Sequence, residues 1–345
     1  MDLKLVLAFL GGIATAAQAN PTCSVPAETQ PFEFKAGQNT LRGFIDLPRA
    51  PGKHPLILIV HGSGSTDVTR RNSYNGSYDE LRTAFREAGF ATAIWDKAGN
   101  GCSEGSYSVQ TPLVERTDEI VAAIDHFKSR EDVDAARIGL WAISTGGWIA
   151  PMAAVRRPEI AFLIVVSSPG RDTASQSEYY AFNRLIQSGV DAAEARQAVA
   201  ALHRAYAITT AGGSRAEFLA AIEPLEKYPV FGRELGITET PEMKASPEAA
   251  RIYHAHQRAR DYALSADTYL RALHQPTLAI FGDRDVQVDW RTSVKIYRES
   301  FELAGNRDLT VKIFKNAGHN LTGADDSGLV DGYVETMVNW LRAHK

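Results

Sequence analysis

Short runs of apolar residues recur along this chain and indicate the strands of a sheet. Each run is four to six residues long with few polar interruptions, which is typical of strands buried on both faces, as in a parallel sheet. Between the runs, apolar residues recur at the spacing of amphipathic helices. Because strands and helices alternate, the pattern predicts an α/β fold with a doubly wound, mostly parallel sheet. The predicted strands are residues 56–60, 91–95, 138–143, 162–166, 278–281 and 309–314.

Two stretches depart from this alternation. Residues 32–35 and 41–45 alternate apolar and polar side chains, which predicts an antiparallel pair ahead of the first buried strand. Residues 171–275 contain no convincing buried strand, and so long a connection indicates an inserted helical cap. The core would then consist of residues 32–170 and 276–345. We expect the cap to lie over the carboxyl edge of the sheet, where open α/β sheets bind ligands.

Within the cap, helical spacing is evident at residues 192–207, 215–225 and 249–273. Seven of the twelve tyrosines of the chain also fall in this insertion. Most of these rings are expected to pack between cap helices, and a minority to line a substrate pocket.

The first residues have the pattern of a secretory signal peptide. Lys4 precedes an apolar run at residues 5–10, and small residues follow in an A-x-A pattern that ends at Ala19. The apolar run is well short of the ~20 residues that a membrane-spanning helix needs. The sequence therefore predicts cleavage after Ala19, with residues 1–19 as the signal peptide, and an exported protein that is periplasmic or secreted.

The mature chain has two cysteines, Cys23 in a lead-in segment at residues 20–31 and Cys102. Export places them in an oxidising compartment, where a bridge is permitted, and two cysteines allow one pairing. From the sequence, a disulfide between Cys23 and Cys102 and a pair of free thiols remain equally open.

Composition and charge narrow the possible partners. Apolar residues make up 44% of the 345 residues and charged residues 23%, so the chain can bury a sizeable core. A net charge of -4 gives no general attraction to nucleic acid or anionic lipid. No P-loop, dinucleotide motif or metal-ligand pattern is evident. We therefore expect a small-molecule substrate, with no cofactor, metal, nucleic acid or membrane span, and the oligomeric state is not indicated.

Two serines lie in nucleophile-like motifs. The pattern G-x-S-x-G is strict around Ser103 and relaxed around Ser144, where alanine replaces the first glycine. A nucleophile of this kind sits on a sharp turn between a strand and a helix. Ser144 follows a predicted strand and precedes a helical stretch, whereas Ser103 lies in a glycine-rich loop that no helix follows. The context therefore favours Ser144 as the nucleophile.

Further motifs follow the predicted strands in a characteristic order. His61-Gly62-Ser63-Gly64 follows the first buried strand, a D-x-R-G-x-G-x-S-like loop with Ala98 in place of arginine follows the second, and the Ser144 turn comes next; Gly282-Asp283-Arg284-Asp285 and Ala317-Gly318-His319 follow the last two. In these motifs the chain resembles the α/β-hydrolase superfamily, in particular its cap-bearing serine esterases and aminopeptidase-like members. The resemblance covers about residues 30–345 and implies an α/β-hydrolase fold, with Ser103 in a structural loop.

The resemblance also implies a catalytic triad. A serine hydroxyl needs a base to take its proton, and a carboxylate must orient that base. The base is expected at His319 and the acid at Asp285, with Asp283 as the second choice. The order Ser, Asp, His is that of α/β hydrolases. Backbone N–H groups of Ser63 and Thr145 are expected to form the oxyanion hole.

The leading hypothesis is thus an exported serine hydrolase that cleaves carboxylic esters through an acyl-enzyme. A cap-bearing aminopeptidase or amidase would use the same triad but would need an acidic anchor for a free amino terminus. A non-catalytic binding protein on a hydrolase scaffold is a further alternative. The presence of Ser, Asp and His in the expected order argues against it.

Overall fold

The computed structural model describes residues 24–69, 73–107, 111–239, 262–323 and 328–344. The predicted signal peptide, residues 1–19, lies outside them. Among the described helices, none is both long and apolar enough to cross a bilayer.

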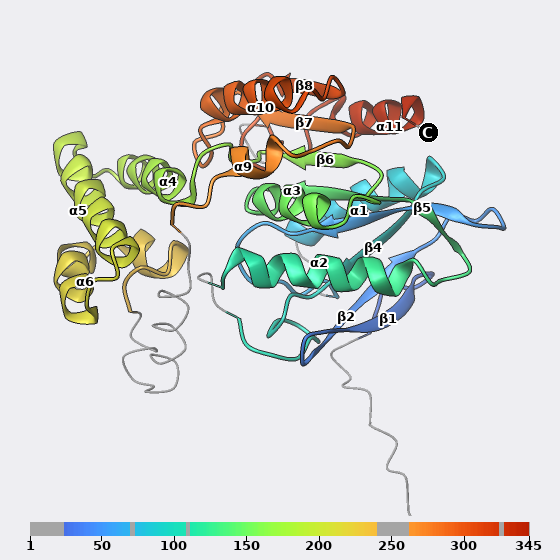
Figure 1. The fold of residues 1–345 in the computed structure, drawn as a ribbon, viewed down its shortest axis with the longest axis horizontal. Coiled ribbons are helices and arrows are strands. Elements are labelled where there is room, and N and C mark those ends of the chain that lie inside the picture. The colour runs from blue at the N-terminus through green and yellow to red at the C-terminus, as the bar shows by residue number, and fades with distance from the viewer. Residues whose placement is uncertain (1–23, 70–72, 108–110, 240–261, 324–327, 345) are drawn as a thin grey trace, which may run out of the picture.

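An eight-stranded sheet runs through the described residues in the order β1-β2-β4-β3-β5-β6-β7-β8 (Figure 1). Strand β1 pairs antiparallel with β2, and β2 pairs antiparallel with β4, while every other neighbouring pair is parallel. This confirms the predicted antiparallel pair and the mostly parallel sheet. The strands are β1 (Gln30–Ala36), β2 (Asn39–Asp46), β3 (His54–Val60), β4 (Ala91–Trp95), β5 (Val133–Ile143), β6 (Leu163–Val166), β7 (Thr277–Gly282) and β8 (Leu309–Phe314).

Helices cover both faces of the sheet. Successive side chains of a strand point to opposite faces, so an apolar run gives the sheet two apolar faces that need covering. In β3, for example, Leu56 and Leu58 belong to one apolar cluster and Ile57 and Ile59 to the other. The first cluster packs against α2 (Leu113–Phe127), α3 (Gly146–Arg156), α9 (Ala266–Leu270) and α10 (Trp290–Ala304). The second packs against α1 (Ser73–Glu87) and α11 (Tyr333–Ala343). The central strands are therefore buried on both faces, as predicted.

Strand β8 is an exception to that prediction. The side chains of Thr310 and Lys312 are exposed, whereas those of Leu309, Val311 and Ile313, on the opposite face, are half-buried against the first cluster, so one face of the strand meets solvent over most of its length. The reason is its place at the edge of the sheet, where it has a single neighbour, β7. The prediction that residues 309–314 are buried on both faces was wrong.

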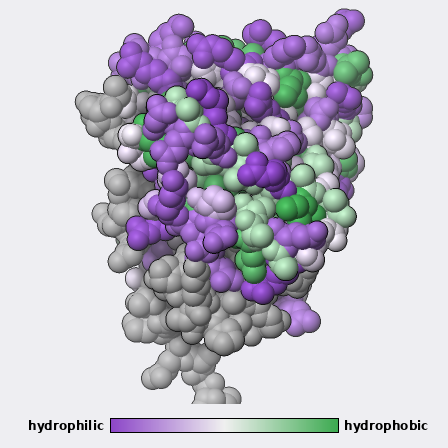
Figure 2. All heavy atoms as spheres, turned by 90° about the vertical axis from the view of Figure 1, so that its left-hand side faces the viewer, coloured by the Kyte–Doolittle hydropathy of each residue, from purple (hydrophilic) through white to green (hydrophobic). Residues whose placement is uncertain are grey.

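The long connection between β6 and β7 forms the cap, at the left of Figure 1. Its helices bury apolar side chains in a cluster of their own, separate from the two sheet clusters. Figure 2 shows the outward side of this part of the molecule, which is mostly hydrophilic with some apolar residues gathered at its lower right. The elements are α4 (Thr173–Gln187), α5 (Ala192–Thr210), α6 (Arg215–Ile222), a 3₁₀ turn η1 (Glu223–Leu225) and a π-helical turn η2 (Val230–Glu234).

The two chain segments that join the cap to the core, residues 172–173 and 264–265, pair with each other and are called the stem. Asp172 and Ser265 form an antiparallel bridge, and the N–H of Thr173 donates to the carbonyl of Leu264 at 3.0 Å. The predicted helix at residues 249–273 is therefore not continuous: part of it lies outside the described residues, the stem interrupts it, and α9 packs on the sheet layer. The predicted cap range of 171–275 thus extends into a stretch that packs with the core.

Candidate active site

Ser144 lies on the sharp turn between β5 and α3, with a backbone φ of 55°. Side chains other than glycine are strained in this left-handed region, which is a recurrent feature of functional sites. Helix α3 begins so close to the sheet that a Cβ on Gly147 would lie 1.5 Å from the Oγ of Ser168. A Cβ on Gly146 would lie 2.9 Å from the carbonyl oxygen of Val60. The local sequence therefore permits a close strand-to-helix turn that lifts Ser144 above the sheet edge.

Asp285 and His319 lie together at the same edge. The Oδ2 atom of Asp285 and the Nδ1 atom of His319 are 2.9 Å apart, with the histidine side chain 9% exposed and the carboxylate fully buried. The other carboxylate oxygen accepts hydrogen bonds from the N–H groups of Gln287 (2.8 Å) and Val288 (2.9 Å). When the Nδ1–H group donates its hydrogen bond to Asp285, the proton stays on Nδ1 and the unprotonated Nε2 is available as a base.

Asp283, the second choice for the acid, has other partners. Its Oδ1 atom accepts the N–H of Asn316 at 2.7 Å, and Oδ2 lies 3.3 Å from the Nζ of Lys315. These contacts fasten the loop that follows β8. Asp283 therefore supports the chain leading to His319 but does not orient its ring.

Contacts between neighbouring strand ends bring the serine and histidine loops to one place. The N–H of Ser144 donates to the carbonyl of Val166 at 2.9 Å, at the end of β6. The hydroxyl of the next residue, Ser167, donates to the carbonyl of His319 at 2.6 Å. The parallel strands β5 to β8 thus present all three groups at their carboxyl ends, where α/β folds carry their sites.

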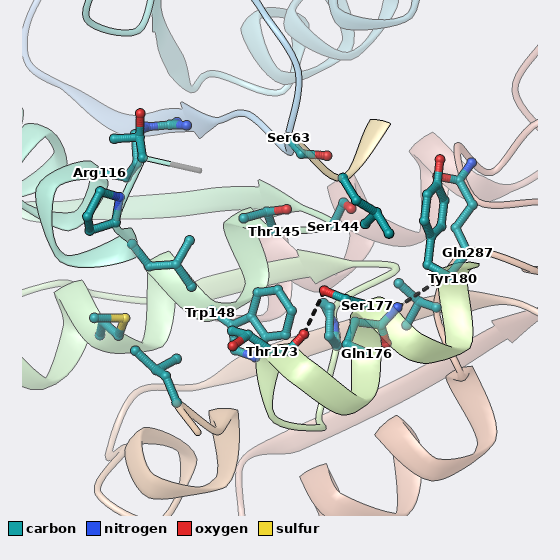
Figure 3. A pocket seen from close by; sticks show the side chains of 18 of the residues that line it. Ser63, Arg116, Ser144, Thr145, Trp148, Thr173, Gln176, Ser177, Tyr180 and Gln287 are labelled. Atoms are coloured by element: carbon teal, nitrogen blue, oxygen red, sulfur yellow. Dashed lines mark hydrogen bonds between the residues drawn. The ribbon is translucent and has the colours of Figure 1, made fainter. Parts of the chain in front are cut away.

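The loop after β3 lies against the serine. A Cβ on Gly62 would approach the Cβ of Ser144 to 3.1 Å, so this loop passes the turn closely. Ser63, Ser144 and Thr145 line one cavity and are seen side by side in Figure 3. Among the described residues, no acceptor is bonded to the N–H groups of Ser63 and Thr145. Unpaired N–H groups of this kind suit an oxyanion that develops at the serine.

Ser103 is engaged differently. Its hydroxyl donates to the carbonyl of Asp96 at 2.7 Å and accepts the N–H of Arg42 at 2.9 Å. It lies in the loop after β4 and no helix follows it directly. These hydrogen bonds join the loop to β2 and to its own first residue after β4, so Ser103 is placed as a structural residue.

A cavity of about 370 Å³ lies between the sheet edge and the cap. This volume is at the small end of the range typical of ligand pockets. Its core side is formed by the serine turn and its cap side by α4, which contributes Thr173, Gln176 and Ser177 (Figure 3). The Nε2 of Gln176 donates to the carbonyl of Gln287 at 2.5 Å, which joins the cap to the loop that carries Asp285.

The charged groups on the cavity wall are compensated. The Nε and Nη2 atoms of Arg184 donate to the two carboxylate oxygens of Glu234 at 2.9 and 3.0 Å, and the hydroxyl of Tyr180 also donates to this carboxylate. Burial alone would raise the pKa of Glu234, but these hydrogen bonds outweigh it and lower the pKa. Arg116 is paired with Glu119 at 3.3 Å. The described part of the cavity wall therefore suits a substrate without net charge.

No pattern in the sequence predicts that Gln176, Glu234 or Arg116 lines the cavity. They come from α4, η2 and α2, and no spacing in the sequence relates these elements to Ser144. Two of the predicted cap tyrosines, Tyr180 and Tyr269, line the cavity, whereas others pack within the cap. Within the described part of the chain, no cluster of three or more His, Cys, Asp or Glu side chains is arranged to hold a metal.

Cys102 carries a disulfide bond. Its predicted partner, Cys23, lies outside the described residues, so the pairing of these two cysteines stays a prediction.

Comparison with known proteins agrees with this architecture. A family model described as "Serine aminopeptidase, S33" matches residues 53–326, which include the site loops and the cap. An Escherichia coli protein described as an uncharacterized 31.7 kDa protein in the traX-finO intergenic region is 37% identical over 102 residues. The match covers 29% of this chain and 32% of that protein, so it spans about a third of the relative's length.

Two solved structures resemble the fold. An esterase of Pyrococcus furiosus is 14% identical, with a TM-score of 0.57 and coverage of 92% of this chain and 91% of that one. A proline iminopeptidase of Mycobacterium smegmatis is 16% identical, with a TM-score of 0.54 and coverage of 91% and 98%. These likenesses show the α/β-hydrolase fold. With the family match extending over most of its length, this chain belongs to the α/β-hydrolase family described as Serine aminopeptidase, S33.

Proposed function

We propose that this chain is an exported serine hydrolase that cleaves small, uncharged carboxylic esters. The observation that carries the proposal is the strained turn at Ser144, on the wall of a cavity at the same sheet edge as the Asp285–His319 pair. Activation of a serine hydroxyl requires a base that a carboxylate orients, and the Asp285–His319 pair supplies both groups at the edge where the Ser144 turn presents its hydroxyl.

In the proposed reaction, the Oγ of Ser144 attacks the ester carbonyl carbon while the Nε2 of His319 takes the hydroxyl proton. The resulting oxyanion accepts hydrogen bonds from the N–H groups of Ser63 and Thr145. The C–O bond to the alcohol then breaks, and His319 returns the proton to the leaving oxygen. A water molecule attacks the acyl-enzyme in the same way, and release of the acid restores Ser144. Asp285 stabilises the imidazolium in both halves of the cycle.

The charges on the cavity wall favour an ester over a peptide with a free amino terminus. Burial of an ammonium group in a cavity is favoured by a carboxylate whose charge is not already neutralised. Glu234 is the carboxylate on the described wall, and both of its oxygens are bound to Arg184. Among the described residues of the wall, the ammonium group of an aminopeptidase substrate would therefore meet no carboxylate that is free to pair with it.

We accordingly expect kcat/KM for short p-nitrophenyl esters to exceed that for aminoacyl p-nitroanilides by about 100-fold, since an unpaired buried ammonium costs about 3 kcal/mol. The comparison uses purified protein at pH 8, with Ser144→Ala to subtract spontaneous ester hydrolysis. A higher kcat/KM for the anilides would favour the aminopeptidase alternative. Absence of labelling by a fluorophosphonate probe would favour a non-catalytic binding protein.

The proposed export rests on the pattern of residues 1–19 and is tested together with the thiols. We expect the protein in the exported fraction, without residues 1–19 and with no thiol titratable after denaturation. Cys23→Ser should lower the melting temperature by roughly 5 °C, because a bridge to Cys102 closes a long loop of the unfolded chain. Two titratable thiols per chain in freshly exported protein would contradict the bridge, and retention in the cytoplasm would contradict the export.

A further inference from the structure

Lys97 is a buried lysine whose head group contacts the loop that carries Ser63. It follows β4, and 1% of its surface is exposed. Lysine is rarely buried to this degree unless its head group is fully engaged. Its Nζ donates hydrogen bonds to the carbonyl oxygens of Gly62 at 2.6 Å and Gly64 at 2.5 Å. These two carbonyls flank Ser63 in the chain.

The first of these carbonyls belongs to the peptide group that supplies the N–H of Ser63. In a trans peptide the C=O and N–H bonds point in opposite directions, and the described chain has no cis peptide bond. Because Lys97 holds the oxygen of Gly62 from one side, the N–H of Ser63 is directed to the other. A donor bound at the carbonyl also polarises the peptide group and strengthens its N–H as a donor.

The position of Lys97 is itself fixed by the surrounding loops. Its backbone N–H donates to the Oγ1 of Thr66 at 3.1 Å, and the N–H of Thr66 donates to the Oδ1 of Asn100 at 2.8 Å. Asp96 accepts the N–H of Val68 at 2.9 Å. The loops after β3 and β4 are therefore joined at several points, and the lysine head group has little freedom to leave its two carbonyls.

The two hydrogen bonds do not depend on the charge of the amine. Burial, and secondly the charge of Arg116, lower the pKa of Lys97 well below its usual value, while Glu119 acts in the opposite direction. An ammonium group has three N–H donors and a neutral amine has two. Both forms can therefore bind the carbonyls of Gly62 and Gly64.

We propose that Lys97 is a positioning residue of the oxyanion hole: its Nζ binds the carbonyls on either side of Ser63 and so aims and polarises the N–H that stabilises the transition state. This inference rests on the proposed serine-hydrolase function. In the sequence, Lys97 occupies the variable second position of a loop that was predicted to be structural, so its contact with the oxyanion loop was not foreseen.

Lys97→Met, which keeps the length of the side chain and removes its donors, tests the proposal. For a p-nitrophenyl ester we expect kcat to fall by roughly 30-fold with KM within about threefold of wild type, because loss of a whole oxyanion donor typically costs about 10²–10³-fold. Affinity for an aryl trifluoromethyl ketone, which forms an oxyanion with Ser144, should fall in parallel. Affinity for the corresponding trifluoromethyl carbinol, which cannot form one, should stay unchanged.

Two further variants separate positioning from stability. Arg82→Met removes another buried cation, which lies in α1 over the ring of Phe44, and should alter thermal stability without changing kcat. Lys97→Gln, which retains an N–H donor, should recover part of the lost kcat. If Lys97→Met does not fold, Lys97→Gln serves as the test, with an expected loss in kcat of roughly fivefold at unchanged KM.

The proposal is overturned if the folded Lys97 variants keep the wild-type kcat and ketone affinity. It is also overturned if they lose affinity for the ketone and the carbinol equally. Failure of the proposed function is distinguishable, since wild-type protein would then show no ester hydrolysis that Ser144→Ala abolishes.

Discussion

Ser144→Ala is expected to lower kcat for ester hydrolysis by about 10⁶-fold and to abolish labelling by a fluorophosphonate probe. The turn between β5 and α3 presents this hydroxyl to the cavity, and alanine at φ 55° supplies no nucleophile. Activity is measured on one p-nitrophenyl ester, with melting curves to show that the variant is folded.

Ser103→Ala is the matched control, since Ser103 has the strict form of the serine motif. Its hydroxyl is occupied by the carbonyl of Asp96 and the N–H of Arg42, so its loss should cost about 1 kcal/mol of stability and keep kcat within roughly tenfold. An inactive, folded Ser103→Ala together with an active Ser144→Ala would show that the nucleophile has been assigned to the wrong serine.

Asp285→Asn is expected to lower kcat by about 10⁴-fold, because an amide permits the wrong tautomer of His319 and does not stabilise the imidazolium. Here the carboxylate is fully buried and its second oxygen is bonded to two N–H groups, so no water can substitute for it easily. His319→Ala should lose nearly as much activity as Ser144→Ala. Both variants are assayed on the same ester.

Asp283→Asn provides the control for the acid. The carboxylate of this neighbour binds Asn316 and Lys315, whereas the imidazole Nδ1 is bound by Asp285, so kcat should stay within about tenfold of wild type. If Asp283→Asn were the inactive variant and Asp285→Asn the active one, the roles of the two carboxylates would have to be exchanged.

The sequence by itself determined the sheet and the order of its elements. Runs such as residues 56–60 are buried on both faces and leave little choice but a parallel strand between helices. The same pattern misled at β8, because an apolar run does not show whether a strand lies inside a sheet or at its edge. There the alternation of Thr310 and Lys312 with apolar residues was the signal of an edge strand.

The candidate triad was predicted from the sequence through its resemblance to α/β hydrolases, and each of the three residues lies in the loop that follows a strand. Parallel strands end at one edge of the sheet, so the position of a residue after its strand already places it in space. The choice between Asp285 and Asp283 was different. A single residue separates these carboxylates, so the sequence could only rank Asp285 first, and the distinction depends on which carboxylate binds the ring of His319.

The tertiary structure alone decided the surroundings of the serine. Glu234 is paired with Arg184 and hydrogen-bonded by Tyr180, both from a cap helix about 50 positions earlier in the sequence. Lys97 binds the loop around Ser63 although it lies 33 positions after Gly64. Such contacts join loops and helices whose separation along the chain follows no fixed period, and they depend on how the loops cross at the sheet edge. Short-range patterns specify which residues reach that edge, whereas the packing of the cap and of the two loops determines what those residues touch.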